Sequence, residues 1–547
     1  MGTSIIFKGK KKVLPGVYSE VKSAIKNPPL DLSYGNILII DTGVGAGWAS
    51  GSGIAGTDKT GKDSIYEFDN VFDYRRHVKG GQNWLIGEPL FLPAGQGVPG
   101  ASKVFYVRAC ATTPGTITYT MTNGSVIFKT KDEGLGANGH ITTGGNLDTG
   151  YACKFIAGIQ DTAKFIFQFY VGTYRGLDAL NNVPYDDITD ELAVPELLLQ
   201  SPEVATIQEL KDWAATDYTF LSLFIDASTI GTASGTLVVG DFTGNTGYKK
   251  ATGGTETYNS THFDSVITAI ASTDNTFFLS DNYSDNAMSL NNEKIFDFCV
   301  NAKYDKFLFV GGGQTKAKYK GGTGSNSSQE IAAFFGNDNV IVCHGGSKKA
   351  IKGSPNFKTY STYYKAAVAL GRCAGLEPQT PLTLKRINID GEVHVLDEKE
   401  LEFALDKGIL VSYFDDELQN FVILQGVNSL QPPNNVFLVN ENGTSFSIAV
   451  NRIASQLNKE IIFNAKKRFY GDDLNGPNRN TISEEDVIAW LNGFLSRKVA
   501  NATDDNLITR FQNIQVTTNQ DNYYVTYEFA PNFEVNKMIF TGFMLDK

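Results

Sequence analysis

A regular alternation of short apolar runs with helical stretches constrains the fold of this chain more than any other feature. Between residues 218 and 376, short apolar runs have the length of one buried strand and several of the stretches between them have helical spacing. Parallel strands joined by helices require right-handed crossovers, so the pattern predicts a doubly wound, mostly parallel sheet. The expected strands are 218–226, 276–280, 306–310 and 339–344, and the expected helices are 285–304, 327–335 and 362–376.

Two earlier apolar runs, residues 36–41 and 103–108, are typical of strands that are buried on both faces. Between residues 112 and 172 the pattern changes to alternating strands separated by turn residues, among them Asn123-Gly124. This change predicts an antiparallel β domain inserted into the α/β core. After residue 375 the elements are mixed, and residues 398–407 and 447–467 have helical apolar spacing.

The chain is therefore expected to hold several domains, which is consistent with its 547 residues and its 41% hydrophobic content. The predicted class is α/β, or α+β over the whole multidomain chain. The predicted units are an N-terminal extended arm (1–28), the first part of the core (29–111), an inserted β-rich outer domain (112–200), the second part of the core (201–374), a C-terminal domain (375–519) and a C-terminal strand arm (520–547).

Both ends of the chain have strand-forming character. At the start, Pro15 excludes a helix interior within residues 13–18, which alternate like an extended segment. At the end, residues 523–529 and 533–545 form two strand-like runs separated by a break at Pro531. The C-terminal strands either close a sheet of their own chain or add to the edge of a neighbour's sheet, and the residues favour neither reading.

A helix is expected to open at Ser483, where a hydroxyl can cap the first turn and three acidic residues follow. Its apolar face has two interpretations, core packing within the domain and contact with a partner, and amphipathicity alone favours core packing. That face consists of Val487, Trp490, Leu491, Phe494 and Leu495.

Composition excludes several classes of protein. The formal net charge of −11 disfavours nucleic acid as a main partner. Neither a signal-peptide pattern nor 18 consecutive apolar residues occur, so we expect no membrane insertion and folding in the cytoplasm. The five cysteines are scattered and odd in number, which favours reduced, buried thiols over a disulfide framework.

An enzyme is the main rival hypothesis, because loops at the carboxyl ends of a doubly wound sheet often carry catalytic groups. The candidates are Asp226, Asp281, the glycines 311–313 and His344. No nucleophile elbow or phosphate-loop spacing is present, and tight backbone turning explains the glycines better. We expect no catalytic residue, no metal ligand and no cofactor, and we interpret His344 as a structural histidine. A non-contractile surface or adhesion protein is the third alternative.

Several motifs, taken in order, resemble the contractile tail sheath family of bacteriophages and related contractile injection systems. Residues 14–18 (LPGVY) are similar to the opening of that family, residues 133–139 (EGLGANG) to its glycine-rich turn, and residues 251–256 (ATGGTE) to its Gly-Gly segment. The resemblance continues through residues 368–375, 407–409, 422–430 and 450–453 to the C-terminal strands, so it spans most of the chain. Gln425 stands where the family tends to have tryptophan, and Arg452 stands alone where two arginines are usual, which indicates a distant branch.

The resemblance implies a structural, non-enzymatic subunit that polymerises helically around an inner tail tube and contracts to drive the tube through a target cell envelope. It implies a core with a subtilisin-like outline, an outward-facing β insertion and a C-terminal domain against the tube. The implied partners are identical copies, the tube protein, the baseplate and the tail terminator, within a virion tail assembled in a bacterial cytoplasm.

Two groups of residues are expected to make the contacts between subunits and with the tube. The terminal arms would add strands to neighbouring subunits, and the helix that begins after Ser483 would face the tube. The arm residues are Val13, Leu14, Pro15, Gly16, Val17, Tyr18, Tyr523, Val525, Tyr527, Phe529, Phe533, Val535, Ile539, Phe540 and Phe543, and the tube-facing residues are Glu484, Glu485, Asp486, Arg497 and Lys498.

Overall fold

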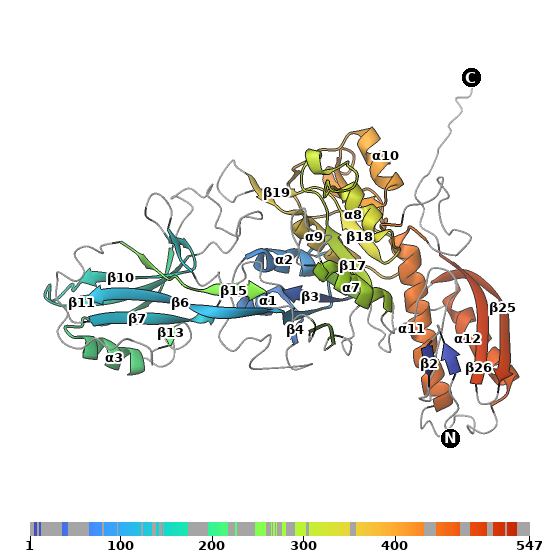
Figure 1. Ribbon diagram of the computed structural model, residues 1–547, viewed down its shortest axis with the longest axis horizontal. Helices are drawn as coiled ribbons and strands as arrows, with labels where there is room; N and C mark the ends of the chain where they lie inside the picture. The colour runs from blue at the N-terminus through green and yellow to red at the C-terminus, as the bar shows by residue number, and fades with distance from the viewer. Residues whose placement is uncertain are drawn as a thin grey trace, which may run out of the picture.

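The computed structural model arranges the chain as three bodies in a row, an outer β domain, an α/β core and a C-terminal unit (Figure 1). The described residues are 5–7, 10–12, 35–41, 65–78, 81–95, 97–121, 124–133, 138–141, 145, 147–172, 195–216, 225–226, 247–258, 264, 266–268, 270, 276–280, 290–301, 306–350, 357–430, 445–470, 482–499, 507–519 and 522–532.

The core is built on a seven-stranded sheet in which neighbouring strands are parallel except at one edge. The predicted strands at 36–41, 103–108, 276–280, 306–310 and 339–344 all lie in it, which confirms the α/β interpretation of this region. In spatial order the strands are β22 (Ile409–Leu410), β18 (Val340–Cys343), β17 (Phe307–Gly311), β16 (Phe277–Ser280), β3 (Asn36–Asp41), β5 (Lys103–Arg108) and the antiparallel β4 (Tyr66–Phe68).

Strand β3 shows why these runs are apolar without interruption. Ile37 and Ile39 point into one hydrophobic cluster, and Leu38 and Ile40 point into another on the opposite face. Side chains alternate along a strand, so a sheet covered on both faces needs apolar residues at every position. Helices α2 (Gly81–Phe91) and α9 (Thr362–Ala374) cover the first face, while α7 (Leu290–Asn301), α8 (Ser328–Phe335) and α10 (Glu398–Asp406) cover the second.

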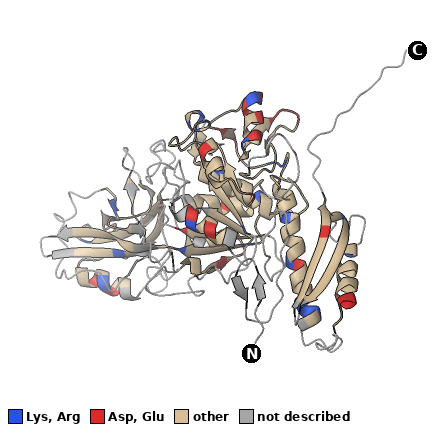
Figure 2. Cartoon of the chain, turned by 45° about the vertical axis from the view of Figure 1, so that its right-hand side comes forward, with Lys and Arg blue, Asp and Glu red and all other residues tan. Residues whose placement is uncertain are grey.

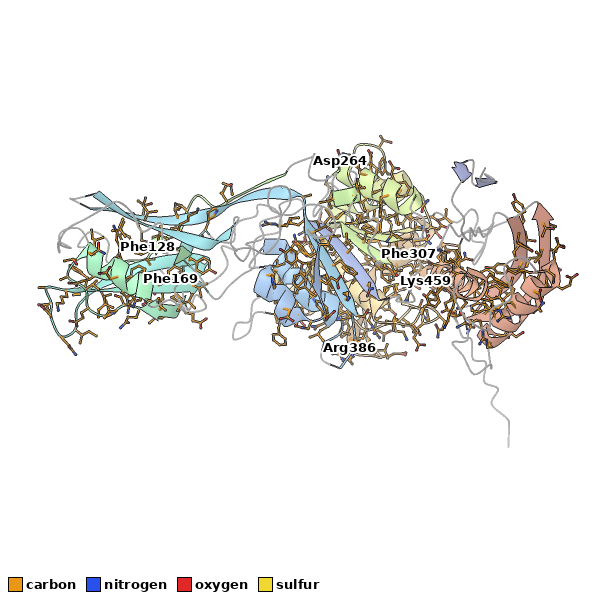
Figure 3. The ribbon with its side chains drawn as sticks, turned by 90° about the horizontal axis from the view of Figure 1, so that it is seen from below. Phe128, Phe169, Asp264, Phe307, Arg386 and Lys459 are labelled. Atoms are coloured by element: carbon orange, nitrogen blue, oxygen red, sulfur yellow. The ribbon has the colours of Figure 1, made fainter. Side chains whose placement is uncertain are left out.

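The inserted domain is antiparallel, as predicted, and consists mainly of two four-stranded sheets. Apolar side chains from both sheets pack together between them, including Phe128 of one sheet and Phe169 of the other, and Figure 3 labels this pair. One sheet holds β13 (Ile225–Asp226), β7 (Gly124–Glu133), β6 (Cys110–Met121) and β15 (Thr255–Tyr258), and the other holds β12 (Pro195–Gln200), β11 (Phe165–Gly172), β10 (Tyr151–Ala157) and β14 (Lys249–Lys250).

The structure corrects the prediction that residues 218–226 belong to the core sheet. The described part of this run, β13, pairs with β7 in the outer domain. Helix α3 (Ile207–Thr216) packs on the same domain through Ile207 and Leu210, and β15 pairs with β6. The chain therefore stays with the outer domain well beyond the predicted boundary at residue 200. An isolated apolar run has no signal that says which of two sheets it joins.

The predicted boundary at residue 374 is also placed too early. Strand β22 extends the core sheet, and Leu382 and Ile423 lie in the core cluster that α9 covers. The remaining short elements near the core are α1 (Val71–His77), the 3-10 turn η4 (Lys316–Lys318), β19 (Ser347–Ala350), β20 (Phe357–Tyr360), β21 (Gly391–Glu392), β23 (Ser412–Asp415) and β24 (Asn420–Ile423).

The C-terminal unit contains two helices and a β-hairpin around a separate cluster of apolar side chains. Its elements are α11 (Ile448–Tyr470), α12 (Glu484–Lys498), β25 (Ile508–Asn519) and β26 (Asn522–Pro531). Two short pairs complete the described strands, β1 (Ile5–Phe7) with β2 (Lys10–Lys12) near the start of the chain, and β8 (His140–Ile141) with β9 (Leu147–Thr149).

Two sequence expectations concern the whole chain. Cys153, Cys299, Cys343 and Cys373 are free and buried, as expected for reduced thiols, and burial raises the pKa of each, to about 12 for Cys299 and Cys343. Within the part of the chain that the structure describes, no helix combines the length and the apolar character needed to cross a bilayer.

Candidate assembly interface

The β25–β26 hairpin forms the described sheet of the C-terminal unit. Its strands pair antiparallel along most of their length, and α12 packs against β25. Among the described residues no third strand pairs with β25 or β26. Glu484 occupies the Thr518 N–H and Val499 bridges Ile508 on the β25 side, so the unoccupied backbone N–H and C=O groups lie mainly along β26. Open edges of this kind are templates for strand addition by another segment.

The hairpin is tied to both helices by polar contacts. Tyr527 donates a hydrogen bond to Asn458 Oδ1 of α11 at 2.8 Å, and burial raises the pKa of Tyr527. Glu484, at the start of α12, accepts hydrogen bonds from the backbone N–H (2.9 Å) and the hydroxyl (2.7 Å) of Thr518. Tyr523 donates its hydroxyl hydrogen to the carbonyl of Ile482. These contacts hold the hairpin in one orientation on the helices.

Apolar and aromatic side chains nonetheless remain in solvent on β26. Tyr523, Tyr524 and Val525 are 40%, 41% and 36% exposed. They follow one another on β26, so they are exposed on both faces of this strand.

Four of the predicted arm residues, Tyr523, Val525, Tyr527 and Phe529, lie in β26, which pairs with β25 of the same chain. That they also link neighbouring subunits stays a prediction. The strand ends at Pro531, where the sequence predicted a break. The other predicted arm residues, Val13, Leu14, Pro15, Gly16, Val17, Tyr18, Phe533, Val535, Ile539, Phe540 and Phe543, lie outside the described residues.

Helix α12 begins as predicted, with a complete capping box. The Ser483 hydroxyl accepts from the Asp486 N–H at 3.1 Å, and Asp486 accepts from the Ser483 N–H at 3.0 Å. The hydrogen bond that the Asp486 carboxylate accepts from the Ser483 N–H lowers the pKa of Asp486. Val487, Leu491, Phe494 and Leu495 are buried, so the apolar face packs within the unit, which is the reading that amphipathicity favoured.

The five charged residues proposed for this helix divide into two groups. Glu485, Asp486 and Arg497 are exposed. Lys498 was expected to face a partner but is buried, with its Nζ 2.7 Å from Glu460 Oε2 of α11, and Glu484 is occupied by Thr518. Figure 2 shows acidic and basic segments interleaved over the C-terminal unit. Some charged side chains of this helix therefore make contacts inside the unit, and the others face solvent.

Two of the glycine-rich sequence motifs meet where the outer domain leaves the core. This region, here called the neck, comprises residues 110–116, 138–139 and 251–258 (Figure 1). Asn138 Nδ2 donates to the Gly254 carbonyl, and the Gly254 N–H donates to Asn138 Oδ1, both at 2.8 Å. Thr116 and Thr252 exchange two backbone hydrogen bonds beside them. The Asn138 amide thus pairs with a peptide group as a strand would.

Close packing beside the neck requires a glycine at position 150. Gly150 has a φ of +67°, and a Cβ there would lie 1.9 Å from the carbonyl oxygen of Asn138. Any side chain at this position would displace the turn that presents the Asn138 amide.

Close packing and hydrogen bonds within the fold account for most of the residues considered as catalytic candidates. A Cβ on Gly313 would lie 1.9 Å from the Lys318 carbonyl oxygen, and Gly311 and Gly312 are packed similarly against α9 and α8, so close approach of backbones accounts for these glycines. His344 is buried and hydrogen bonded to Ser328 and His394, as expected for a structural histidine. Asp226 lies in the outer domain, and Asp281 lies outside the described residues.

Sequence reasoning missed the polar groups that surround His344. Ser328, Lys365, Glu392, His394 and Glu400 come from four separate segments and are all buried. No sequence spacing connects them, because they converge only through the sheet and its helices. Among the described residues, no group of three or more His, Cys, Asp or Glu side chains is arranged to hold a metal ion.

One small cavity lies between the core and the C-terminal unit. Phe307 at the start of β17 and Lys459 on α11 both line it, and Figure 3 labels the two residues where these bodies meet. Its volume of about 10 Å³ has room for no more than a water molecule. The two bodies are therefore closely packed at this junction.

Comparison with known proteins supports the resemblance that the motifs indicated. No protein-family model matches the sequence. The tail sheath protein of Bacillus phage SP01 is 22% identical over 590 aligned positions, covering 96% of this chain and 94% of that protein. The sheath tail protein of Desulfitobacterium hafniense has a TM-score of 0.53 at 16% identity, covering 94% of this chain and 97% of the other. A sheath tail protein of Listeria innocua has a TM-score of 0.47 at 14% identity, covering 93% of each chain.

These comparisons confirm the predicted resemblance to tail sheath proteins. The match to the phage protein spans nearly the full length of both chains, so it includes the outer domain and the C-terminal unit as well as the core. The likeness to the Desulfitobacterium protein extends to the fold of almost the entire chain.

Proposed function

We propose that this chain is a structural, non-enzymatic subunit of a contractile tail sheath. The main support for this proposal is the match to a tail sheath protein over nearly the full length of both chains. This match spans all three bodies of the molecule. The subunit would polymerise helically around an inner tail tube, within a virion tail assembled in the bacterial cytoplasm. Its further partners would be the baseplate and tail terminator proteins.

The terminal segments would connect the copies of this polymer. The β25–β26 hairpin supports this proposal, because no third strand pairs with it among the described residues and β26 exposes Tyr523, Tyr524 and Val525. Segments 1–20 and 533–547 of neighbouring subunits would add strands to the hairpin. A head-to-tail contact that does not close into a ring generates an open helix, as a tube of identical copies requires.

Contraction follows if the connected copies have two arrangements that differ in free energy. Strand links would keep neighbours joined while the subunits rotate, so one subunit that changes would bias the next. The extended arrangement is then a kinetically trapped state. In this proposal the core has a subtilisin-like outline, the outer β domain faces outward, and α12 faces the tube through the exposed Glu485, Asp486 and Arg497.

Electron microscopy of the purified full-length protein tests this function. We expect helical tubes or stacked rings at micromolar protein concentration. A discrete monomer with enzymatic turnover would replace the proposal with the enzyme hypothesis. Ligand binding by a protein that never assembles would favour an adhesion protein instead.

A further inference from the structure

Four polar side chains form a buried line beside the carboxyl edge of the core sheet. Ser328 opens α8, His344 follows β18, His394 follows β21 and Glu400 lies in α10. Ser328 Oγ lies 2.8 Å from His344 Nδ1, and His344 Nε2 lies 2.9 Å from His394 Nδ1. His394 Nε2 lies 3.4 Å from Glu400 Oε2. The exposed fractions are 0%, 1%, 5% and 8% along the line.

The charge at one end determines where the hydrogens lie. An ionised Glu400 only accepts, so His394 Nε2 carries the hydrogen that faces it, and His394 Nδ1 accepts from His344 Nε2–H. His344 Nδ1 then accepts from the Ser328 hydroxyl, whose oxygen accepts from the Gly313 N–H at 2.8 Å. Both rings are therefore neutral. The last contact is the weakest, because Nε2 of His394 makes no hydrogen bond of good geometry among the described residues.

Glu400 is held in its ionised form by its neighbours. Burial raises its pKa, but a hydrogen bond from the Asp397 N–H and the contact with Lys316, whose Nζ is 3.3 Å away, bring the net pKa below its usual range. The direction of the hydrogen bonds therefore persists at neutral pH.

A second proton cannot be accommodated without separating the rings. When both imidazoles are charged, each nitrogen of the 2.9 Å contact carries a hydrogen, and two donors face each other. A single proton added at His344 Nδ1 faces the Ser328 oxygen and leaves the Ser328 hydroxyl hydrogen without its acceptor. Uptake of protons is thus opposed by geometry before any charge is considered.

Neighbouring charges oppose protonation as well. Lys365 of α9 forms a buried ion pair with Glu392, which also accepts from the Ser412 hydroxyl. Burial, the positive Lys365 and the second ring hold the pKa of His344 well below its usual value. Burial also lowers the pKa of His394, against the effect of Glu400. The groups that face the two rings are Lys316, Tyr319, Cys343, Lys365, Glu392, Asp397 and Glu400.

We propose that this line, here called the histidine latch, holds the α10 segment (residues 393–407) on the core and releases it on acidification. The segment also contacts the core through the Val393 N–H, the Lys316–Glu400 pair and a few apolar side chains, among them Leu396. Ala404 is buried, Leu401 and Phe403 are half-buried, and Val395 is 78% exposed. Tyr319 binds the Glu400 carbonyl from the other side. Loss of the His344–His394 contact would remove the side-chain hydrogen bond that joins the end of β18 to this segment.

The direction of the pH effect follows from the histidines. Each has a lower pKa while the segment is docked than in contact with water, where the value is roughly 6.5. Docking is therefore at full strength above that value and weakens as pH falls below it. The effect belongs to the individual chain, so it can hold or fail regardless of whether the chain forms a sheath.

Hydrogen exchange of the full-length protein at pH 7.5 and 5.5, corrected for intrinsic rates, tests the latch. We expect opening of residues 393–407 to increase by about tenfold or more at pH 5.5 in the wild type. His394→Gln keeps an acceptor and a donor but cannot be protonated, so its change should stay below about threefold. His77→Gln is the matched control, because His77 is only partly buried, lies on α1 and should respond like the wild type. An equal acid response in wild type and His394→Gln would overturn the proposal.

A measurement on the wild type alone covers the case in which His394→Gln does not fold. In protein labelled with ¹⁵N-histidine, both latch residues should be neutral with hydrogen on Nε2, and they should gain protons only when residues 393–407 lose protection. Ordinary titration of either ring near pH 6.5 with protection unchanged would overturn the proposal equally well.

Discussion

At the scale of single residues, the core contains polar groups whose arrangement explains why they are tolerated there. Lys365 and Glu392 are both almost fully buried and paired, and the Ser412 hydroxyl satisfies the second carboxylate oxygen. A buried ion is costly unless each partner is compensated, and here each one is. Such a pair contributes little net stability but makes either single residue hard to replace.

Substitution of Lys365 tests this asymmetry. Lys365→Met leaves Glu392 buried without its cation, so the free energy of unfolding should fall by about 3–5 kcal/mol in urea unfolding. The double variant Lys365→Met/Glu392→Leu removes both ions and should recover a large part of the loss.

The exposed pair Lys294–Asp264 is the matched control, with a separation of 2.5 Å and side chains 31% and 62% exposed. Lys294→Met should cost less than about 1 kcal/mol. Equal losses for the two single variants would show that burial of the Lys365 pair has no energetic consequence.

At the scale of elements, the neck is where sequence motifs acquire a structural meaning. Residues 133–139 and 251–256 are separated by more than a hundred positions, yet Asn138 and Gly254 exchange two hydrogen bonds. Neither motif alone indicates the other as its partner. The glycines allow the two turns to approach, and the amide of Asn138 supplies both a donor and an acceptor.

Replacement of Asn138 by aspartate tests the neck. The change converts the donor that faces the Gly254 carbonyl into an acceptor, so urea unfolding should show a loss of about 1–3 kcal/mol in the free energy of unfolding. Asn492→Asp is the control, because Asn492 makes one hydrogen bond on the exposed face of α12. If Asn138→Asp unfolds at the same urea concentration as that control, the side-chain pairing does not stabilise the neck.

At the scale of the whole molecule, the three bodies have different relations to assembly. The core is closed by helices on both faces of its sheet, whereas the β25–β26 hairpin has open edges among the described residues. Among the described residues this sheet has only two strands, so further strands could extend it without rearrangement of its own chain. The proposed sheath function therefore concentrates the links between copies at the C-terminal unit.

Deletion of residues 1–20 tests these links at the level of the polymer. The truncated chain should retain a folded core, measured by circular dichroism and thermal unfolding, but should form no tubes in electron microscopy. A chain in which residues 1–20 are replaced by the same residues in scrambled order controls for length and composition, and it should also fail to assemble. Normal polymerisation of the truncated chain would contradict a role for the N-terminal arm.

The sequence by itself determined the features that depend on neighbours along the chain. The run 36–41 is apolar at every position and became a strand buried on both faces, and Ser483 with Asp486 closed the capping box that begins α12. Strands β6 and β7, which flank the predicted turn, likewise pair antiparallel. These signals are local, because burial on both faces, cap bonds and turn geometry need only a few adjacent residues.

The tertiary structure decided which distant segments meet. It paired residues 522–531 with 508–519 of the same chain, placed 225–226 in the outer domain, and buried Lys498 against Glu460. It also brought His394 to His344 across 50 positions. The physical reason is that an apolar strand or a long charged side chain can be satisfied by many partners, and which one it takes depends on what the rest of the fold places beside it.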